Sequence, residues 1–389
     1  MLTRAIHRFI RTTPSSSTSR SRSSQNSLPA AYYRGGTSRA VFFNRADLPP
    51  NQADWAPIFR GVIGSPDPYG RQLDGLGGGI SSLSKVCVVG PSTHDAADVD
   101  YTFAALGVKN TDVDFSSNCG NMVSAVGPYA VESGVFDPSQ SSTSCSSALV
   151  RIHNTNTGKI IHASFPVVEG EAAARGDLAI DGVAGTAAAI QLDFIDPAGS
   201  RTGKMLPTGK VRDVFDGVGA SCVDVANPCV FVRAEDLGVR GTLTPEEISA
   251  TDGLLERLDS IRRQAGVAMG LAERVQDVPG SVPKIGMVSA PEQGEGRRVD
   301  LVVRALSVGQ PHKAVPITVA LALATAARLE GSTVEEVTSQ EKVDAAGITI
   351  GHASGSILVG ATFGDDGGLQ FATVFRTARR LFEGRIFWK

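Results

Sequence analysis

The feature that most limits how this chain can fold is an internal repeat. The body of the chain matches itself at an offset of roughly 190 to 200 residues, and the matches keep one order along both copies. A period of this length indicates two similar halves, each large enough to form a domain. The four matched pairs are AVFFNRADLP (40–49) with CVFVRAEDLG (229–238), SKVCVVGPS (84–92) with PKIGMVSAP (283–291), VDYTFAALGV (99–108) with VDLVVRALSV (299–308), and the segment after SSNCGN with AVPITVALALATAARLEG (314–331).

Each half combines strand-like and helix-like segments. The alternating apolar residues of the short matched runs are typical of strands, whereas the long apolar segment in each half is typical of a helix. We therefore predict two similar α+β domains that face each other across a cleft. Equivalent loops from both halves would line this cleft, and sites between domains are common.

The first 27 residues differ in composition from the rest of the chain. They contain five arginines and eight serines, and no acidic residue precedes Asp47. On a helix, Leu2 and Ile6 would share an apolar face, with Arg4 and Arg8 on the opposite side. This pattern predicts a mitochondrial transit peptide and a location in the matrix. The alternative is a disordered basic tail, and the protein would then be cytoplasmic.

The charge of the remaining chain limits its partners. Without the leader, 32 basic and 40 acidic side chains give a formal charge near −8, so nucleic acid is not an expected partner. No apolar run approaches the roughly 20 residues of a membrane-spanning helix, so no membrane association is expected. The five cysteines form no C-x-x-C pair and have no histidine at zinc-finger spacing, which argues against a metal site and a disulfide framework.

The first of three loops that could bind a ligand or take part in catalysis is YRGGTSRAVFF. Gly35 and Gly36 free the backbone N–H groups, Thr37 and Ser38 add hydroxyls, and Arg34 offers a fork of guanidinium donors. Such a loop can hold a carboxylate. Taken alone, it is equally compatible with a tight turn before a strand.

The second loop, DGLGGGISSLSKVCVV, leads to Lys85. It lacks G-x-x-x-x-G-K-[ST], and its glycines precede the strand instead of following it, so ATP and NAD are not predicted. Lys85 could clamp an anion or exchange a proton with a substrate. A surface lysine at the start of a strand is the simpler alternative.

The third stretch, SSNCGNMV, places Cys119 just ahead of an apolar helix, where the thiol could be packed, bind a metal or act as an acid/base. Gly120 lets the backbone approach a ligand closely. The positive end of the helix dipole favours a thiolate, and the first N–H groups of a helix bind carboxylates. The residues predicted to form this binding turn are Asn118, Gly120, Asn121 and Met122.

The second half contains equivalent loops. HKAVPITV stands where the repeat places the NCGN turn, and GHASGS is a turn able to offer N–H groups and hydroxyls to an anion. A histidine is more often a surface or core residue than a catalyst, but these two loops are directed at the cleft by the repeat. The residues predicted to bind substrate from this half are Ser289, His312, Lys313, His352, Ser354 and Gly355.

Taken together, these motifs resemble a known family. RGGTSRAVFF, DGLGGGISSLSK, SNCGNMVSAVGPYAVESG, HKAVPITVALALA, GHASGSILVGA and FRTARRLFEG are similar to the PrpF family of cofactor-independent isomerases. The resemblance implies a diaminopimelate-epimerase-like fold with two pseudo-symmetric domains, each a mixed sheet around a central helix. The implied domains are 28–195, completed by 372–389, and 196–371.

The resemblance also implies a substrate and catalytic residues. The substrates would be unsaturated di- or tricarboxylates such as aconitate, methylaconitate or methylitaconate, with no cofactor and no metal. The acid/base lysine of the family falls on Lys85 and its active-site cysteine on Cys119. The usual RGGTSKG reads RGGTSRA in this chain, a departure at Arg39 and Ala40.

We hypothesise a 1,3-proton shift across an allylic system. Lys85 or Cys119 would remove a proton next to a carboxylate, whose developing charge is stabilised by N–H donors. Racemases of this fold use one cysteine from each half, and the second half has no thiol in PHKAV. Two alternatives stay open: a non-catalytic accessory protein of an aconitase-like Fe–S dehydratase, and an amino- or hydroxy-acid epimerase. A homodimer is a further open alternative.

Overall fold

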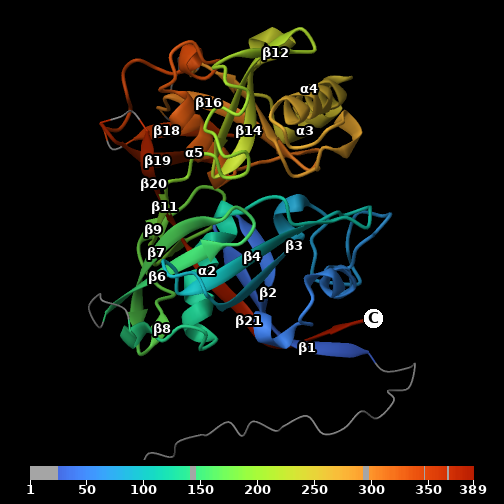
Figure 1. Cartoon of the computed structure of the whole chain (residues 1–389), viewed down its shortest axis with the longest axis vertical. Coiled ribbons are helices and arrows are strands. Elements are labelled where there is room, and N and C mark those ends of the chain that lie inside the picture. Colours follow the sequence, from blue (N-terminus) through green and yellow to red (C-terminus); the bar gives the residue numbers. More distant parts are fainter. Residues whose placement is uncertain (1–24, 141–145, 292–297, 346, 366–367) are drawn as a thin grey trace, which may run out of the picture.

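The computed structural model describes residues 25–140, 146–291, 298–345, 347–365 and 368–389. Figure 1 shows two lobes stacked along the long axis of the molecule, one built around the helix α2 and the other around the helix α5. The predicted leader, residues 1–27, lies outside the described residues except for its last three positions. Its predicted role as a transit peptide therefore stays a prediction.

The helix α2 (Gly120–Glu132) forms the centre of the N-terminal lobe. It is apolar on every side, and each of its residues from Gly120 to Val131 is buried. A helix of this kind must be enclosed, and the sheet curves around it. The helix α1 (Trp55–Ile63) packs on the other face of this sheet, where Phe59 stacks on Phe43. The strands of this lobe are β1 (Asn26–Gly35), β2 (Ser38–Asn44), β3 (Lys85–Pro91), β4 (Val99–Leu106), β5 (Val113–Asp114), β6 (Ser147–Asn154), β7 (Lys159–Val168), β8 (Glu171–Ala172), β9 (Leu178–Ala179), β10 (Thr186–Ala187) and β11 (Ile190–Ile195).

The C-terminal lobe repeats this plan around α5 (Ile317–Ala326). All ten residues of ITVALALATA are buried, so this helix too is enclosed on every side. The helices α3 (Pro245–Ala250) and α4 (Leu254–Ala268) cover the outside, and α4 contributes Leu258 and Ile261 to a second apolar cluster. The strands of this lobe are β12 (Asp213–Phe215), β13 (Val218–Val225), β14 (Asn227–Arg233), β15 (Lys284–Ser289), β16 (Leu301–Ser307), β17 (Gln310–Pro311), β18 (Ile348–His352) and β19 (Gly355–Phe363).

The strand pairing of the two lobes reproduces the repeat. In the parallel pair β2–β3, Val41 lies opposite Val86, and in the parallel pair β14–β15, Val230 lies opposite Ile285. Both pairs keep the sequence match of 40–49 with 229–238 and of 84–92 with 283–291. The first two matches of the repeat are therefore correct residue by residue.

The third match is shifted by two residues. Asp98 donates its N–H to Arg151, and Asp300 donates its N–H to Thr349, so these two aspartates occupy equivalent places. The sequence match of 99–108 with 299–308 instead aligned Asp300 with Asp100. Because side chains alternate across a strand with a period of two, the slip leaves every residue on the correct face of the sheet.

The end of the chain joins the two lobes. The strand β20 (Leu369–Arg376) pairs with β11 of the N-terminal lobe and with β19 of the C-terminal lobe. The final strand β21 (Ala378–Trp388) then pairs antiparallel with β1 from Asn26 to Gly35. One continuous sheet therefore crosses the junction, which fixes the two lobes relative to each other.

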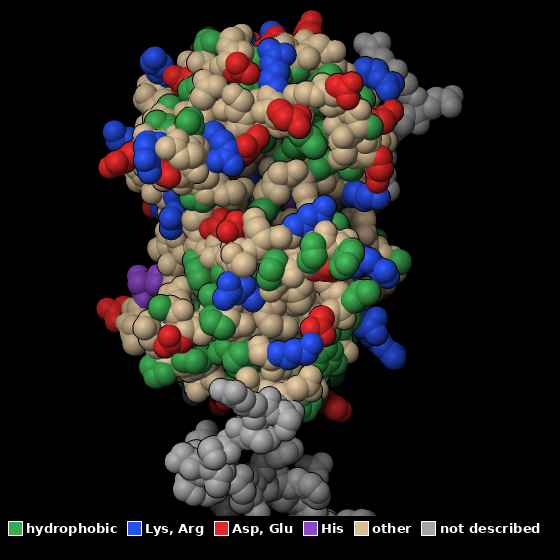
Figure 2. Space-filling model, turned by 90° about the vertical axis from the view of Figure 1, so that its right-hand side faces the viewer, with side chains coloured by type: hydrophobic (Ala, Val, Ile, Leu, Met, Phe, Trp, Pro, Cys, Tyr) green, Lys and Arg blue, Asp and Glu red, His purple; other side chains and the backbone are tan. Residues whose placement is uncertain are grey.

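The surface carries charges of both signs. On the face drawn in Figure 2, basic and acidic side chains are interspersed over both lobes, and no continuous basic area covers the described part of this face. Among the described residues, no helix is both long and apolar enough to cross a membrane.

Candidate active site

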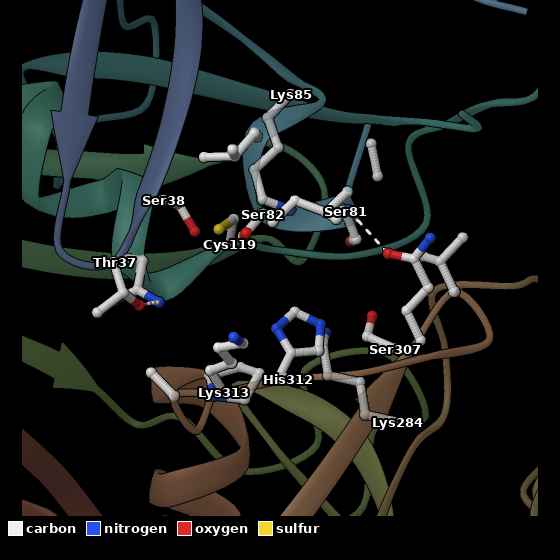
Figure 3. Close-up of a pocket in the computed structure, with 18 of the residues that line it drawn as sticks. Thr37, Ser38, Ser81, Ser82, Lys85, Cys119, Lys284, Ser307, His312 and Lys313 are labelled. Atoms are coloured by element: carbon white, nitrogen blue, oxygen red, sulfur yellow. Dashed lines mark hydrogen bonds between the residues drawn. The ribbon is translucent and has the colours of Figure 1, made fainter. Parts of the chain in front are cut away.

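A cavity of about 700 Å³ lies between the lobes and is lined by residues of both. Figure 3 shows its polar side chains: Lys85 and Cys119 enter from the N-terminal lobe, and Lys284, His312 and Lys313 enter from the C-terminal lobe. A concave site between two domains with convergent polar groups is the usual form of a small-molecule site.

The N-terminal wall consists of strand ends and one helix start. Thr37 lies in the tight turn between β1 and β2, Ser38 is the first residue of β2, and Lys85 is the first residue of β3. Lys85 is only 6% exposed, and its Nζ lies 5.3 Å from the centre of the Phe103 ring. An ammonium against an aromatic face, with almost no contact with bulk water, is poised for a ligand inside the cavity.

Cys119 lies at the start of α2, as predicted, and is the N-cap residue of this helix. Its backbone is extended (φ −112°, ψ 93°), and its carbonyl accepts the N–H groups of Met122 and Val123. The N–H groups of Gly120 and Asn121 have no acceptor within the helix because they lie in its first turn. The thiol therefore sits beside a helix N-terminus that is open to an anion.

The other lobe holds this turn in place. The side chain of Asn227, at the start of β14, accepts a hydrogen bond from the N–H of Asn118 (3.1 Å) and donates one to its carbonyl (2.8 Å). Gly120 permits the starts of the two central helices to meet, since a Cβ at this position would lie 2.7 Å from Cβ of Ile317. The turn that carries Cys119 is thus positioned by contacts that cross the lobe boundary.

The C-terminal wall of the cavity carries lysine and histidine side chains. Lys284, the first residue of β15, is 6% exposed, and burial lowers its pKa. Burial, with the nearby charges of Lys85 and Lys284, lowers the pKa of His312 to about 3, so this imidazole is neutral at physiological pH. Lys313 lies near the rim and pairs with Glu246 at 3.1 Å.

Four buried polar atoms of the cavity wall have no hydrogen-bond partner among the described residues: Oδ1 of Asn118 and of Asn121, Nζ of Lys284 and Nε2 of His312. Leaving a buried polar group unpaired costs about 1–3 kcal/mol, so such groups are rare and call for an explanation. Two donors or acceptors come from each lobe. The wall is therefore shaped for a polar ligand that touches both lobes at once.

Most of the predicted site residues meet in this cavity. Ten of them line it: Thr37, Ser38, Lys85, Asn118, Cys119, Gly120, Asn121, His312, Lys313 and Ser354. Figure 3 labels six of these, in positions around a common space. The roles predicted for them as catalytic and binding groups remain predictions.

Six predicted residues do not line the cavity: Arg34, Gly36, Met122, Ser289, His352 and Gly355. Two of them, Arg34 and Gly36, support it from behind. Arg34 donates hydrogen bonds to the carbonyls of Gly36 (3.0 Å) and Thr377 (2.8 Å), which shapes the loop before Thr37. Gly36 adopts φ +51°, and a Cβ there would lie 2.2 Å from Oδ1 of Asn121. These residues shape the binding loop and do not face a ligand.

Packing explains why the other predicted residues do not line the cavity. Met122 is fully buried in the core of the N-terminal lobe because α2 is enclosed on all sides. Burial, with the charge of Arg376, lowers the pKa of His352 to about 4, and its Nδ1 lies 3.2 Å from Oγ of Ser354. Ser289 ends β15 next to Gly241, and Gly355 lies against Asp181.

Sequence reasoning missed several lining residues, of which Lys284 is the most important. The signal was available, because the repeat aligns SKVCVV with PKIGMV and hence Lys85 with Lys284. The other missed polar residues of the wall are Ser81, Ser82, Ser117, Glu246, Ser249, Ser281, Ser307, Gln310 and Thr318. Among the described residues, no group of three or more His, Cys, Asp or Glu side chains is arranged to hold a metal ion.

The chain is similar to known proteins over most of its length. The family described as "PrpF protein" matches residues 25–389. The 3-methylitaconate isomerase of Eubacterium barkeri is 39% identical over 381 residues, covering 94% of this chain and 98% of that protein. The 2-methyl-aconitate isomerase of Shewanella oneidensis is 37% identical over 388 residues, covering 93% of this chain and 97% of that protein.

Solved structures confirm the predicted fold class. The crystal structure of a methylitaconate-delta-isomerase has a TM-score of 0.73 and 38% identity, covering 94% of this chain and 96% of that one. A hydroxyproline epimerase from Agrobacterium vitis has a TM-score of 0.52 at 10% identity, covering 93% of this chain and 92% of that one, and shows a shared fold alone. The α+β, epimerase-like architecture predicted from the sequence is correct.

Proposed function

The chain belongs to the PrpF family, and from this premise we propose that it is an isomerase of a small unsaturated di- or tricarboxylate, in which it moves or reorients a C=C bond by proton transfer next to a carboxylate. One observation carries the proposal. Buried Lys85 and Lys284 face the same cavity from opposite lobes, and the only carboxylate among its described lining residues, Glu246, already pairs with Lys313. A wall with this charge selects a polyanion.

The binding groups suit carboxylates. The hydroxyls of Thr37 and Ser38 and the first N–H groups of α2 can each donate to an oxygen, and Lys313 can pair with one at the rim. A carboxylate held at the start of α2 would place the adjacent carbon beside Cys119. Charge that develops on this carboxylate during proton removal is then stabilised by fixed donors instead of water.

Proton transfer would begin at Lys85 or Cys119, which both reach the cavity from the N-terminal lobe. One of these groups removes a proton from the carbon next to the held carboxylate, and the electron pair of the broken C–H bond becomes part of an enediolate. Protonation two carbons away completes the shift of the double bond. The fixed donors and the lysines supply the charge stabilisation that this step needs.

Proton NMR in deuterated buffer tests this function. The purified protein should shift the double bond in at least one acid of a panel of aconitate, methylaconitate, itaconate and mesaconate, with deuterium entering at the reacting carbons. Lys85→Ala should abolish the shift of the double bond, whereas Lys109→Ala, at an exposed lysine outside the cavity, should retain it. Full turnover by Lys85→Ala would refute the assignment.

The epimerase alternative has less support than the isomerase. In the C-terminal lobe, the N-cap of the central helix is Pro316, which occupies the place that Cys119 takes in the N-terminal lobe. A racemase of the two-thiol type needs a second acid/base there, and proline offers none. Exchange of the α-proton of a saturated amino acid by the protein would reverse this judgement.

Two protein partners are also proposed for testing: an aconitase-like Fe–S enzyme and a second copy of the chain. A variant that combines Lys85→Ala with Cys119→Ala distinguishes an accessory role from catalysis, because an accessory protein would still support its partner. Light scattering after size-exclusion chromatography would give the mass of the particle, and a value near twice 40.5 kDa would indicate a homodimer.

For the first 27 residues we propose mitochondrial targeting. The support is their composition, which is rich in arginine and serine and contains no acidic residue. A fluorescent protein fused behind residues 1–27 should enter mitochondria. The same fusion with Arg4, Arg8 and Arg11 changed to alanine should stay in the cytoplasm, and equal localisation of both fusions would contradict the proposal.

A further inference from the structure

We infer that Lys284 is a second proton-transfer group of this isomerase, which acts on the substrate from the C-terminal lobe while Lys85 acts from the N-terminal lobe. The inference rests on the proposed function and deepens it.

The two lysines hold equivalent places in the repeat. Lys85 opens β3 and Lys284 opens β15, and the pairing of each strand with its parallel neighbour keeps one register. Both side chains are 6% exposed, and both line the cavity. Figure 3 shows them entering from opposite lobes, with Cys119 and His312 in the space between.

The surroundings of Lys284 do not fit a structural lysine. A buried ammonium that serves stability pairs with a carboxylate, yet Nζ of Lys284 has no hydrogen-bond partner among the described residues. The carboxylate of Asp114 instead accepts the N–H and the hydroxyl of Ser116 and the N–H of Ser281. Nothing in the described protein holds this amine, so it is free to bond a ligand.

The same surroundings favour exchange of a proton. Burial lowers the pKa of Lys284, and the neighbouring charge of Lys85 lowers it further. A lowered pKa makes the neutral amine of Lys284, which is the form that accepts a proton, easier to reach. With this amine as base and a proton donor on the opposite lobe, the cavity would hold one base and one acid.

The chemistry balances with this pair alone. The amine of one lysine takes the proton from the allylic carbon, and the electron pair of that C–H bond forms the new C=C bond. The old π pair moves to the far carbon and takes a proton from the ammonium of the other lysine. The product is an isomer of the substrate, and the two lysines have exchanged protonation states. A proton that passes between the two lysines through water, or the reverse reaction, restores their initial protonation states.

The main competitor is a lysine that only clamps a carboxylate by its charge. Arginine keeps the charge but cannot act as a base in a protein, so Lys284→Arg separates the two roles. Under our inference, both Lys284→Arg and Lys284→Gln lose turnover by about 100-fold or more, since a general acid/base contributes roughly 10² to 10⁴. A clamp would instead leave Lys284→Arg active and raise the KM of Lys284→Gln at little change in kcat.

Isotope exchange gives a sharper readout. In deuterated buffer, Lys284→Gln should let Lys85 exchange the allylic proton of one isomer without moving the double bond. Lys85→Gln should exchange only the allylic proton of the other isomer, supplied as the starting acid. These complementary labelling patterns, observed by proton NMR, are what two proton-transfer groups predict and a single base does not. Lys210→Gln, at an exposed lysine of the same lobe, is the matched control and should behave as wild type.

Several results would overturn the inference. They are wild-type turnover by Lys284→Gln, recovered turnover in Lys284→Arg, or loss of exchange with both isomers in Lys284→Gln. If Lys284→Gln melts at a much lower temperature than wild type, Lys284→Ala is used, and methylamine should restore its turnover. Lack of rescue in a folded Lys284→Ala protein counts against the inference. Failure of the proposed function looks different, because wild type itself would then label no acid of the panel.

Discussion

Asn227 should be essential for holding the turn that carries Cys119, although Asn227 does not line the cavity. Its side chain crosses the lobe boundary and bonds both the N–H (3.1 Å) and the carbonyl (2.8 Å) of Asn118, in the manner of a neighbouring strand. Its amide also donates to Oγ1 of Thr318 at 3.4 Å. Asn227 is fully buried, so water cannot replace these bonds. The substitution Asn227→Ala removes all of them.

The expected loss of stability follows from the groups left behind. Two backbone groups of Asn118 lose their partner, and each unpaired buried group costs about 1–3 kcal/mol, which gives about 2–6 kcal/mol in total. Domains are stable by roughly 5–15 kcal/mol, so the variant should still fold at low temperature. Because Cys119 directly follows Asn118, we also expect kcat to fall by about 10- to 100-fold, as is typical for a displaced catalytic group.

Urea unfolding and steady-state turnover at about 15 °C measure both effects. Ser221→Ala is the matched control, since the Ser221 hydroxyl donates to the carbonyl of Val211 (2.8 Å) and accepts the N–H of Thr333 (3.0 Å) in the same lobe. It should lose comparable stability at unchanged kcat because Ser221 lies outside the cavity wall. A loss below about 1 kcal/mol in Asn227→Ala, or equal kcat in both variants, would refute the reasoning.

Two further predictions concern the cavity wall. The folded chain keeps His312 neutral down to a pKa of about 3, whereas the unfolded chain protonates this residue near pH 6.5, so acidification costs stability. Between pH 7 and pH 4, the free energy of unfolding of His312→Gln, measured in urea, should therefore fall by about 3 kcal/mol less than that of wild type. Identical pH profiles of the two proteins would contradict this. Gly36→Ala should lower substrate affinity in calorimetry, because the new Cβ would lie 2.2 Å from Oδ1 of Asn121. Gly158→Ala has similar backbone strain (φ +67°) but meets nothing within 4 Å, so it should keep wild-type affinity.

The sequence predicts the architecture of this protein well because the repeat encodes it twice. Each half carries the same order of strands and helix, and the apolar character of both central helices indicates that they are enclosed. The slip of two residues in the third match arises because Asp100 and Asp300 each follow a valine and look alike in sequence. The hydrogen bonds of Asp98 and Asp300, and the registers of the pairs β4–β6 and β16–β18, reveal the equivalent pair.

The candidate site is predicted less completely, for physical reasons. Cys119 and Lys85 are recognisable because a helix start and a strand start have local signals. Asn227 is not, since its bonds join residues 109 positions apart and nothing near it in sequence marks them. Arg34 looks like an anion clamp, but its guanidinium is used by two backbone carbonyls. The place of Lys284 in the cavity wall could have been predicted by applying the repeat to single residues as well as to whole segments.

The pairing of the first and last strands has a consequence for how the protein is made. β1 leaves the ribosome early, yet its partner β21 is the last strand to be synthesised, with Asn26 lying opposite Trp388. At roughly 5–20 residues per second, this gap lasts about 20 to 70 s. During that interval the N-terminal lobe lacks β21 and the bridging strand β20, so it cannot close. Closure of the N-terminal lobe must therefore follow the synthesis of residues 369–388, and the pairing edge of β1 stays uncovered until then.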